Sequence, residues 1–228
     1  MKIVDLEVTA LRDLNQALHD LPANKTTRPW QIVNPKGRHA IACGIDSPVT
    51  VEIEGHVGYY CAGMNKQAKV LINGNAGQGV AENMMSGIVR VKGDASQSAG
   101  ATGCGGLLII EGKTSARCGI SLKGLDIVVR GSVGHMSGFM AQAGRIVVLG
   151  DAGEALGDSI YEAEIFVRGV VKSLGADCIE QPLDEEAAVR LTELLVRSGM
   201  EDANAEDFRR YGSARELYHF KSQNVGAY

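Results

Sequence analysis

Glycine recurs along this chain at every nineteenth position. It stands at seven successive positions with that step, namely 55, 74, 93, 112, 131, 150 and 169. Glycine accounts for 29 of the 228 residues, so chance does not produce such a series. A fixed period of this length is typical of repeat architectures, in which each copy packs only against its neighbours. The chain is therefore expected to fold as a solenoid.

The residues just before each of these marker glycines follow an alternating apolar pattern. The segments read VEIEG, VLING, VRVKG, LIIEG, IVVRG, IVVLG and IFVRG. Alternation of β-branched residues predicts a strand with one buried face. The inward pairs, four and two places before the marker, are Val51/Ile53, Val70/Ile72, Val89/Val91, Leu108/Ile110, Ile127/Val129, Ile146/Val148 and Ile165/Val167.

Small residues also recur after the marker. Glycine lies three places later at 58, 77, 134 and 153, and glycine or alanine lies seven places later at 62, 81, 100, 119, 138, 157 and 176. Such residues let the backbone bend sharply, or take positive φ, beside the neighbouring coils. Each copy is therefore interpreted as a strand, a bend, a second short segment and a second bend.

These features predict a mainly β protein, a right-handed single-stranded parallel β-helix of about seven 19-residue rungs. Repeats of two packed helices need about 33 residues, whereas strands of a β-helix stack about 4.8 Å apart. The expected organisation is an N-terminal strand and helix cap over 1–48, the β-helix over 49–181, and a C-terminal helical cap or docking tail over 182–228. A hexapeptide-repeat acyltransferase is disfavoured because six does not divide the period.

The stretch VLINGNAGQGVAENM, residues 70–84, contains half of a dinucleotide-binding fingerprint. A Rossmann unit would continue with a helix and an acidic residue about 20 places further on, whereas here another strand and another marker follow. In register, Gly74 is a marker and Gly77 lies at a bend. Only Gly79 has no role that the repeat explains.

Capping elements are expected at both ends, because a solenoid otherwise ends in an unpaired sheet edge. At the N-terminus we expect a strand over residues 2–8, a helix over residues 9–21 and a proline-bearing loop. At the C-terminus, Pro182 and Asp184 begin a helix that ends at Gly199. Its apolar face is expected to contain Ala188, Leu191 and Leu195.

Two short helices are expected after that C-terminal helix. Ser213 and Glu216 form a candidate capping box for the second of them. These elements matter because the outward position three places before the marker is apolar in the last four rungs. Its residues there are Ile109, Val128, Val147 and Phe166. Either the C-terminal helices or a partner subunit is expected to cover this stripe, since such a surface does not face water.

A second outward position, just before the marker, carries charge. Glu111 lies one rung from Lys92 and one rung from Arg130. This spacing predicts a ladder of opposite charges that helps to fix the register.

Composition excludes several classes of partner. A net charge of -4 and a pI near 5.8 provide no basic surface for nucleic acid or an anionic membrane. The start MKIVDLEV lacks the features of a signal peptide, and no apolar run approaches the roughly 18 residues of a membrane span. We therefore expect a cytoplasmic protein. A carbohydrate-active β-helix enzyme is disfavoured, because an acidic or aromatic groove is also missing.

No set of residues predicts a catalytic, cofactor-binding or metal site. His56 and His135 would lie on different faces and four rungs apart, too far to share a metal ion. Cys61 and Cys118 would lie three rungs apart, too far for a disulfide, and free thiols are expected throughout. Cys104, in the segment GATGCGG, has no histidine base at a fixed spacing. The carboxylates that recur too irregularly to form a site are Glu82, Asp158 and Asp177.

The glycine-marked rungs resemble the GXGXG β-helix domain, which occurs at the carboxyl end of the large subunit of glutamate synthase and in a subunit of formylmethanofuran dehydrogenase. The resemblance spans residues 49–178. The flanking segments LRDLNQALHDLP and HFKSQNVGAY look most like the stand-alone form of this domain. That form is the β-helix subunit of methylamine-glutamate N-methyltransferase, also called N-methylglutamate synthase.

This resemblance implies a non-catalytic structural subunit of a transferase complex. One partner would be similar to a glutamine amidotransferase, another would be a synthase-like subunit with FMN and an iron–sulfur cluster, and the β-helix would brace the two. The implied reaction makes N-methyl-L-glutamate and ammonia from methylamine and L-glutamate. A multi-chain glutamate synthase, or a formylmethanofuran dehydrogenase-type complex, would use the same architecture. No catalytic motif of the family maps onto this chain, so its cofactors are expected in a partner.

Overall fold

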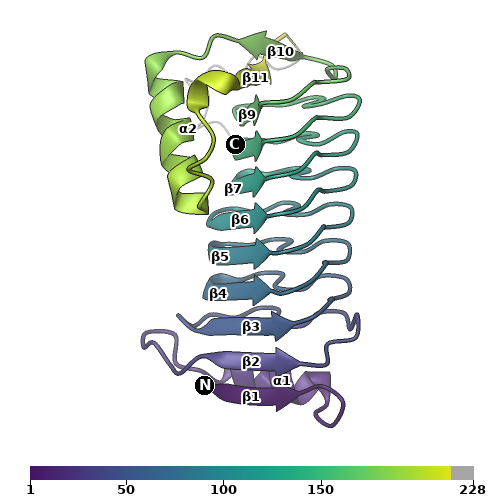
Figure 1. The fold of residues 1–228 in the computed structure, drawn as a ribbon, viewed down its shortest axis with the longest axis vertical. Coiled ribbons are helices and arrows are strands. Elements are labelled where there is room, and N and C mark those ends of the chain that lie inside the picture. Colours follow the sequence, from purple (N-terminus) through teal and green to yellow (C-terminus); the bar gives the residue numbers. More distant parts are fainter. Residues whose placement is uncertain (217–228) are drawn as a thin grey trace, which may run out of the picture.

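The computed structural model describes residues 1–216, which form a rod of stacked coils (Figure 1). Each predicted rung contributes one strand to a continuous sheet, and neighbouring rungs pair in parallel with the step of the repeat, as Val51 with Val70 and Val70 with Val89. The seven strands are β3 (Thr50–Glu54), β4 (Lys66–Ile72), β5 (Ser86–Val91), β6 (Leu107–Ile110), β7 (Lys123–Val129), β8 (Ala143–Val148) and β9 (Glu164–Val167). The predicted β-helix is confirmed.

The interior of the rod is filled by the alternating aliphatic residues. All fourteen residues of the inward pairs, from Val51 to Val167, are 0 % exposed. Full burial stabilises each of them by roughly 1.5–3 kcal/mol before chain entropy is counted. Since every rung adds its pair to one continuous core, a single rung has no stability of its own.

The sheet begins earlier than the sequence predicted. Strand β1 (Lys2–Asp5) and helix α1 (Leu11–His19) are shorter than expected, and the expected loop contains a further strand, β2 (Trp30–Val33). β2 pairs in parallel with β3, and β1 with β2. β2 escaped the repeat search because Trp30 pairs with Val51, so its step to the next strand is longer than the repeat.

The C-terminal end also differs from the prediction. Strand β10 (Cys178–Gln181) and helix α2 (Glu185–Ser198) follow the last rung. After them come a single 3₁₀ helix, η1 (Ala205–Asp207), and strand β11 (Arg209–Ser213), where two helices were expected. β11 lies between β9 and β10 and is antiparallel to both, which ends the parallel coil.

The expected Ser213–Glu216 capping box does not form. The Ser213 hydroxyl lies on β11 and donates to Asp177 at 2.7 Å, and the Glu216 N–H also donates to Asp177. The remainder of the expected second helix, and the segment HFKSQNVGAY, fall within 217–228, outside the described residues.

The bends contain more left-handed residues than the glycine pattern indicated. Alanine or glycine seven places after the marker has positive φ in six rungs, as at Ala62 (φ 54) and Ala81 (φ 57). A second left-handed position lies five places after the marker, at Tyr60 (φ 59) and at Gly79 (φ 70). Gly79, which the repeat left unexplained, therefore occupies a corner that is left-handed in the neighbouring rung too.

The marker positions require glycine because of close contact between coils. A Cβ at Gly74 would lie 2.5 Å from the carbonyl group of Gly55 in the coil below. The coils thus touch backbone to backbone at this corner. The next residue of each rung often binds across the coils, and the His56 Nδ1 accepts a hydrogen bond from the Asn75 N–H at 2.9 Å. Asn75, Asp94, Ser132 and Asp151 accept equivalent bonds from the following rung.

Candidate interaction site on the helical cap

Helix α2 covers the apolar stripe on the outer face of the sheet. It lies along the stack of strands near the C-terminal end (Figure 1). Its side chains form a second core with the stripe residues, which are at most 1 % exposed. This core contains Ile109, Val128, Val147 and Phe166 of the rungs, and Ala187, Leu191, Leu194 and Leu195 of α2. Of the two alternatives that the sequence left open, the intramolecular cover is correct.

The ends of α2 are fixed by the caps that the sequence predicted. The Asp184 carboxylate accepts a hydrogen bond from the Ala187 N–H at 2.8 Å, and Gly199 ends the helix with φ 72. One detail of the face was wrong, because Ala187 is buried and Ala188 is only partly buried. A shift of one residue turns a helix by about 100°, so Ala188 points away from the centre of the core.

An ion pair with a buried carboxylate lies against α2. Arg145 binds both oxygens of the Asp126 carboxylate, at 2.8 and 2.6 Å, and Arg197 of the helix lies 3.5 Å from the same group. The hydrogen bonds that Arg145 donates to Asp126 raise the pKa of the arginine. Such a bidentate pair holds two neighbouring rungs in register and contacts the helix above them.

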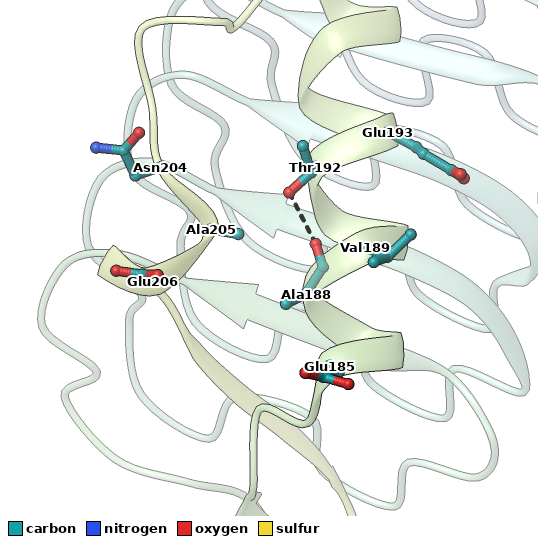
Figure 2. A pocket seen from close by; sticks show the side chains of 8 residues that line it. All are labelled: Glu185, Ala188, Val189, Thr192, Glu193, Asn204, Ala205 and Glu206. Carbon is teal, nitrogen blue, oxygen red and sulfur yellow. Dashed lines mark hydrogen bonds between the residues drawn. The ribbon is translucent and has the colours of Figure 1, made fainter.

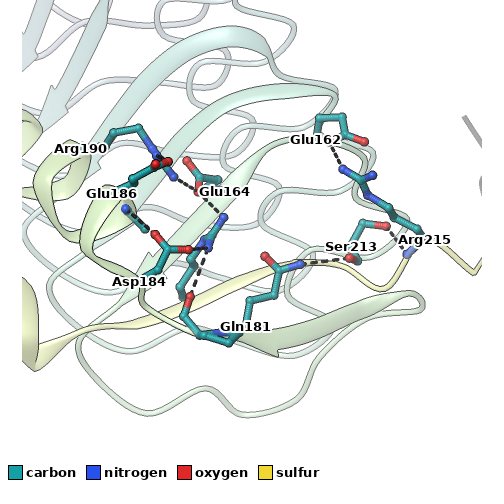
Figure 3. A network of polar contacts seen from close by, with 11 residues as sticks. Glu162, Glu164, Gln181, Asp184, Glu186, Arg190, Ser213 and Arg215 are labelled. Carbon is teal, nitrogen blue, oxygen red and sulfur yellow. Dashed lines mark hydrogen bonds and ion pairs between the residues drawn. The ribbon is translucent and has the colours of Figure 1, made fainter. Parts of the chain in front are cut away.

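A second polar network joins the start of α2 to the last rung (Figure 3). Arg210 of β11 lies 2.7 Å from Glu164 of β9 and 3.1 Å from Asp184 at the helix N-terminus. Arg190 of α2 also binds Glu164, at 3.0 Å. The network therefore connects three elements that are far apart in sequence.

The other end of α2 is held by Arg90 of β5. Its guanidinium donates to the Ser198 carbonyl at 2.7 Å and binds Glu111 at 2.9 Å. The predicted charge ladder is present in part, since Lys92 lies 3.6 Å from Glu111, while Arg130 binds Asp202 at 3.0 Å instead. The ladder fails at Arg130 because the segment after α2 brings a closer carboxylate.

A groove of about 660 Å³ runs between α2 and the segment that carries η1 (Figure 2). Its lining combines an apolar floor with three carboxylates and includes no basic residue. The lining residues are Glu185, Ala188, Val189, Thr192, Glu193, Asn204, Ala205 and Glu206. Val189 is 57 % exposed. Sequence reasoning missed this groove, although the high density of acidic residues after position 183 was a visible signal.

The negative charge of the chain is concentrated on this cap. Residues 184–208 contain eight Asp and Glu against two Lys and Arg, a net charge of -6, so the remaining chain carries a net +2. Asp184, Glu186 and Asp202 of this segment have ion-pair partners. Within residues 1–216, no ion pair involves the three groove carboxylates.

The residues weighed as chemical candidates remain dispersed. His56 accepts the hydrogen bond from the Asn75 N–H across neighbouring coils, and His135 lies four rungs further along. All five cysteines are free; Cys104 is exposed and Cys43 is half-buried. The described part of the chain, residues 1–216, contains no group of three His, Cys, Asp or Glu side chains placed to hold a metal ion. Over the same range, no helix has the length and apolar character needed to cross a bilayer.

Burial keeps the remaining three thiols protonated at neutral pH. It raises the pKa of Cys118 and of Cys178 to about 12, and it raises the pKa of Cys61 as well. A thiol is a poor nucleophile when it stays protonated at neutral pH. These cysteines therefore pack as small apolar side chains.

Fold and site together define a parallel β-solenoid with a helical cap. No protein-family model matches the chain. It is 57 % identical over 228 residues to Protein GlxC of Rhizobium meliloti (strain 1021), an alignment that covers 100 % of both chains. The chain belongs to the same family as Protein GlxC.

Proposed function

We propose that the chain is a non-catalytic structural subunit of a glutamate synthase-like complex. The observation that carries the proposal is the regular core, in which fourteen aliphatic residues of seven rungs are fully buried. A rod filled in this way holds its surface groups at fixed positions, and rigid surfaces bind with little loss of conformational entropy. The resemblance of the rungs to the GXGXG domain supports the same assignment.

The proposed complex has two further kinds of subunit in the cytoplasm. One is similar to a glutamine amidotransferase, and the other is a synthase-like subunit that binds FMN and an iron–sulfur cluster. We propose methylamine and L-glutamate as substrates, and N-methyl-L-glutamate and ammonia as products. The main alternative is a multi-chain glutamate synthase, which would use glutamine as nitrogen donor.

The test is native purification of the full chain through an affinity tag from cells that express its neighbouring genes. Two additional subunits and a flavin absorption spectrum are expected in the purified complex. The complex should form N-methylglutamate when supplied with methylamine and glutamate, and the chain alone should not. Glutamate formation from glutamine would favour the alternative, whereas a chain that purifies without either subunit would contradict the proposal.

A further inference from the structure

We propose that the α2 groove, the surface lined by residues 185–193 of α2 and by residues 204–206, binds a basic segment of a partner subunit that carries aliphatic side chains. This inference rests on the proposed function, because the occupant belongs to a partner in the complex. It adds the surface that is used and the chemistry of the segment that fits it.

The apolar part of the groove is not needed by the cap itself. The buried face of α2 already covers the stripe with Leu191, Leu194 and Leu195. On its outer side the helix exposes Val189 by 57 % and Val196 by 54 %. Val189 and the methyl groups of Ala188 and Ala205 line the groove and offer aliphatic surface to an occupant.

The negative charge of the groove favours a positively charged occupant. Three of the lining residues are acidic, Glu185, Glu193 and Glu206, and none is basic. A neutral or acidic segment would form no ion pair with these carboxylates, whereas Lys or Arg side chains would form ion pairs with them at the rim of the groove. Complementary charge of this kind sets specificity and accelerates association. An aliphatic segment with Lys or Arg at its flanks therefore fits both features.

The groove is also held in one shape. Asp184 and Arg210 fix the start of α2 to the last rung, and Arg90 fixes its end to β5. On the other side, Met200 and Phe208 of the segment are buried in the same core as α2, and Asp202 pairs with Arg130 at the surface. Because both walls are fixed before binding, the occupant does not have to order them.

The first experiment compares variants in the purified complex. Glu193→Lys with Glu206→Lys, and separately the uncharged change Val189→Asn, should weaken association with one partner by about tenfold or more, an effect measured by titrating the partner at low salt. Matched controls at the opposite end of the rod are Asp13→Lys with Asp20→Lys, and Val8→Asn, whose side chains are exposed. All four proteins should keep the thermal unfolding midpoint of the wild type within a few degrees, since the changed side chains are on the surface.

The outcomes separate this inference from the proposed function. If the wild-type chain recruits no partner at all, the proposed function fails. If the complex forms and the groove variants bind as the wild type does, or if the controls lose binding equally, the groove is not the docking site and this inference fails.

A photo-crosslinking amino acid at Thr192 identifies the occupant directly. Thr192 lines the groove and its side chain is exposed (Figure 2). Mass spectrometry of the crosslinked complex should find a partner peptide with more Lys and Arg than Asp and Glu. A crosslink to a second copy, to residues 217–228 of the same chain, or to an acidic peptide would overturn the inference.

Discussion

Arg145 and Asp126 form a two-bonded ion pair between neighbouring rungs, with nitrogen–oxygen distances of 2.8 and 2.6 Å, under the cover of α2. Asp126 is only 7 % exposed, and Arg145 is the nearer of its two ionic partners. Arg145 also donates to the carbonyl of Arg190 in the helix at 3.4 Å. The pair thus connects β7, β8 and the cap.

Loss of the Arg145 side chain should be costly. Arg145→Met removes the two-bonded partner of the buried Asp126 carboxylate and leaves only Arg197, 3.5 Å away, so we expect the free energy of unfolding to fall by about 3 kcal/mol. Urea denaturation at pH 7 measures this change. Arg38→Met, at an exposed arginine, is the control and should stay within about 0.5 kcal/mol of the wild type. If Arg145→Met behaves as the control does, the pair contributes nothing to stability.

The stripe residues should behave as core residues of the isolated chain. Phe166 is fully buried against α2, so Phe166→Ala should destabilise by about 3–5 kcal/mol. Val128→Asp should release the helix even when no partner is present. Limited proteolysis within α2, compared with the wild type, detects this release. A protease-resistant α2 in Val128→Asp would show that the helix does not depend on the stripe.

Gln67 offers a site for stabilisation. It has φ 114 at the irregular position of β4, where the next rungs place Gly87 (φ 83) and Gly106 (φ 92). A side chain with this φ is strained, so Gln67→Gly should raise the free energy of unfolding by about 1 kcal/mol, despite the loss of exposed bonds to Ala23 and Asp46. Gly87→Ala should change stability in the opposite direction. The inference of strain fails if both variants lower the unfolding midpoint.

The buried thiols predict a loss of stability at high pH. In the unfolded chain a cysteine has a pKa near 8.5, whereas burial raises the pKa of Cys118 and Cys178 to about 12 in the folded chain. Their contribution is complete below about pH 8.5 and is lost as pH rises, by about 1.4 kcal/mol per unit for each thiol. Urea unfolding at pH 8, 9 and 10 measures this slope. The variant Cys118→Ala with Cys178→Ala should be less stable at pH 8 but show a shallower decline, and an unchanged slope would contradict the prediction.

The rungs were predictable because local pattern and long-range pairing agree in them. In β2 the step to the next strand is longer and Asn34 stands where the other rungs have glycine, so the periodic signal disappears although Trp30 and Ile32 are buried. β11 reads RRYGS, a charged segment with little strand character of its own. Its conformation depends on pairing with β9 and β10, which no local pattern encodes.

The site was predictable only in outline. The caps of α2 follow from Asp184 and Gly199, and its amphipathic pattern indicates a buried face. A groove, however, needs both walls, and the second wall is the short 3₁₀ helix η1 with the residue before it, where the sequence predicted a short helix but not its position. Its position depends on contacts such as Arg130 with Asp202, between residues 72 places apart.

Because α2 is anchored at both ends, its length has to match the stack of strands between the two anchors. Fourteen residues of helix measure about 21 Å, and the four strand spacings from β5 to β9 measure about 19 Å. A rung added or deleted within that interval would keep the 19-residue period and yet separate Ser198 from Arg90, or Asp184 from Arg210. The length of α2 therefore fixes the number of coils beneath it, while the coils before β5 are free to vary in number as the chain evolves.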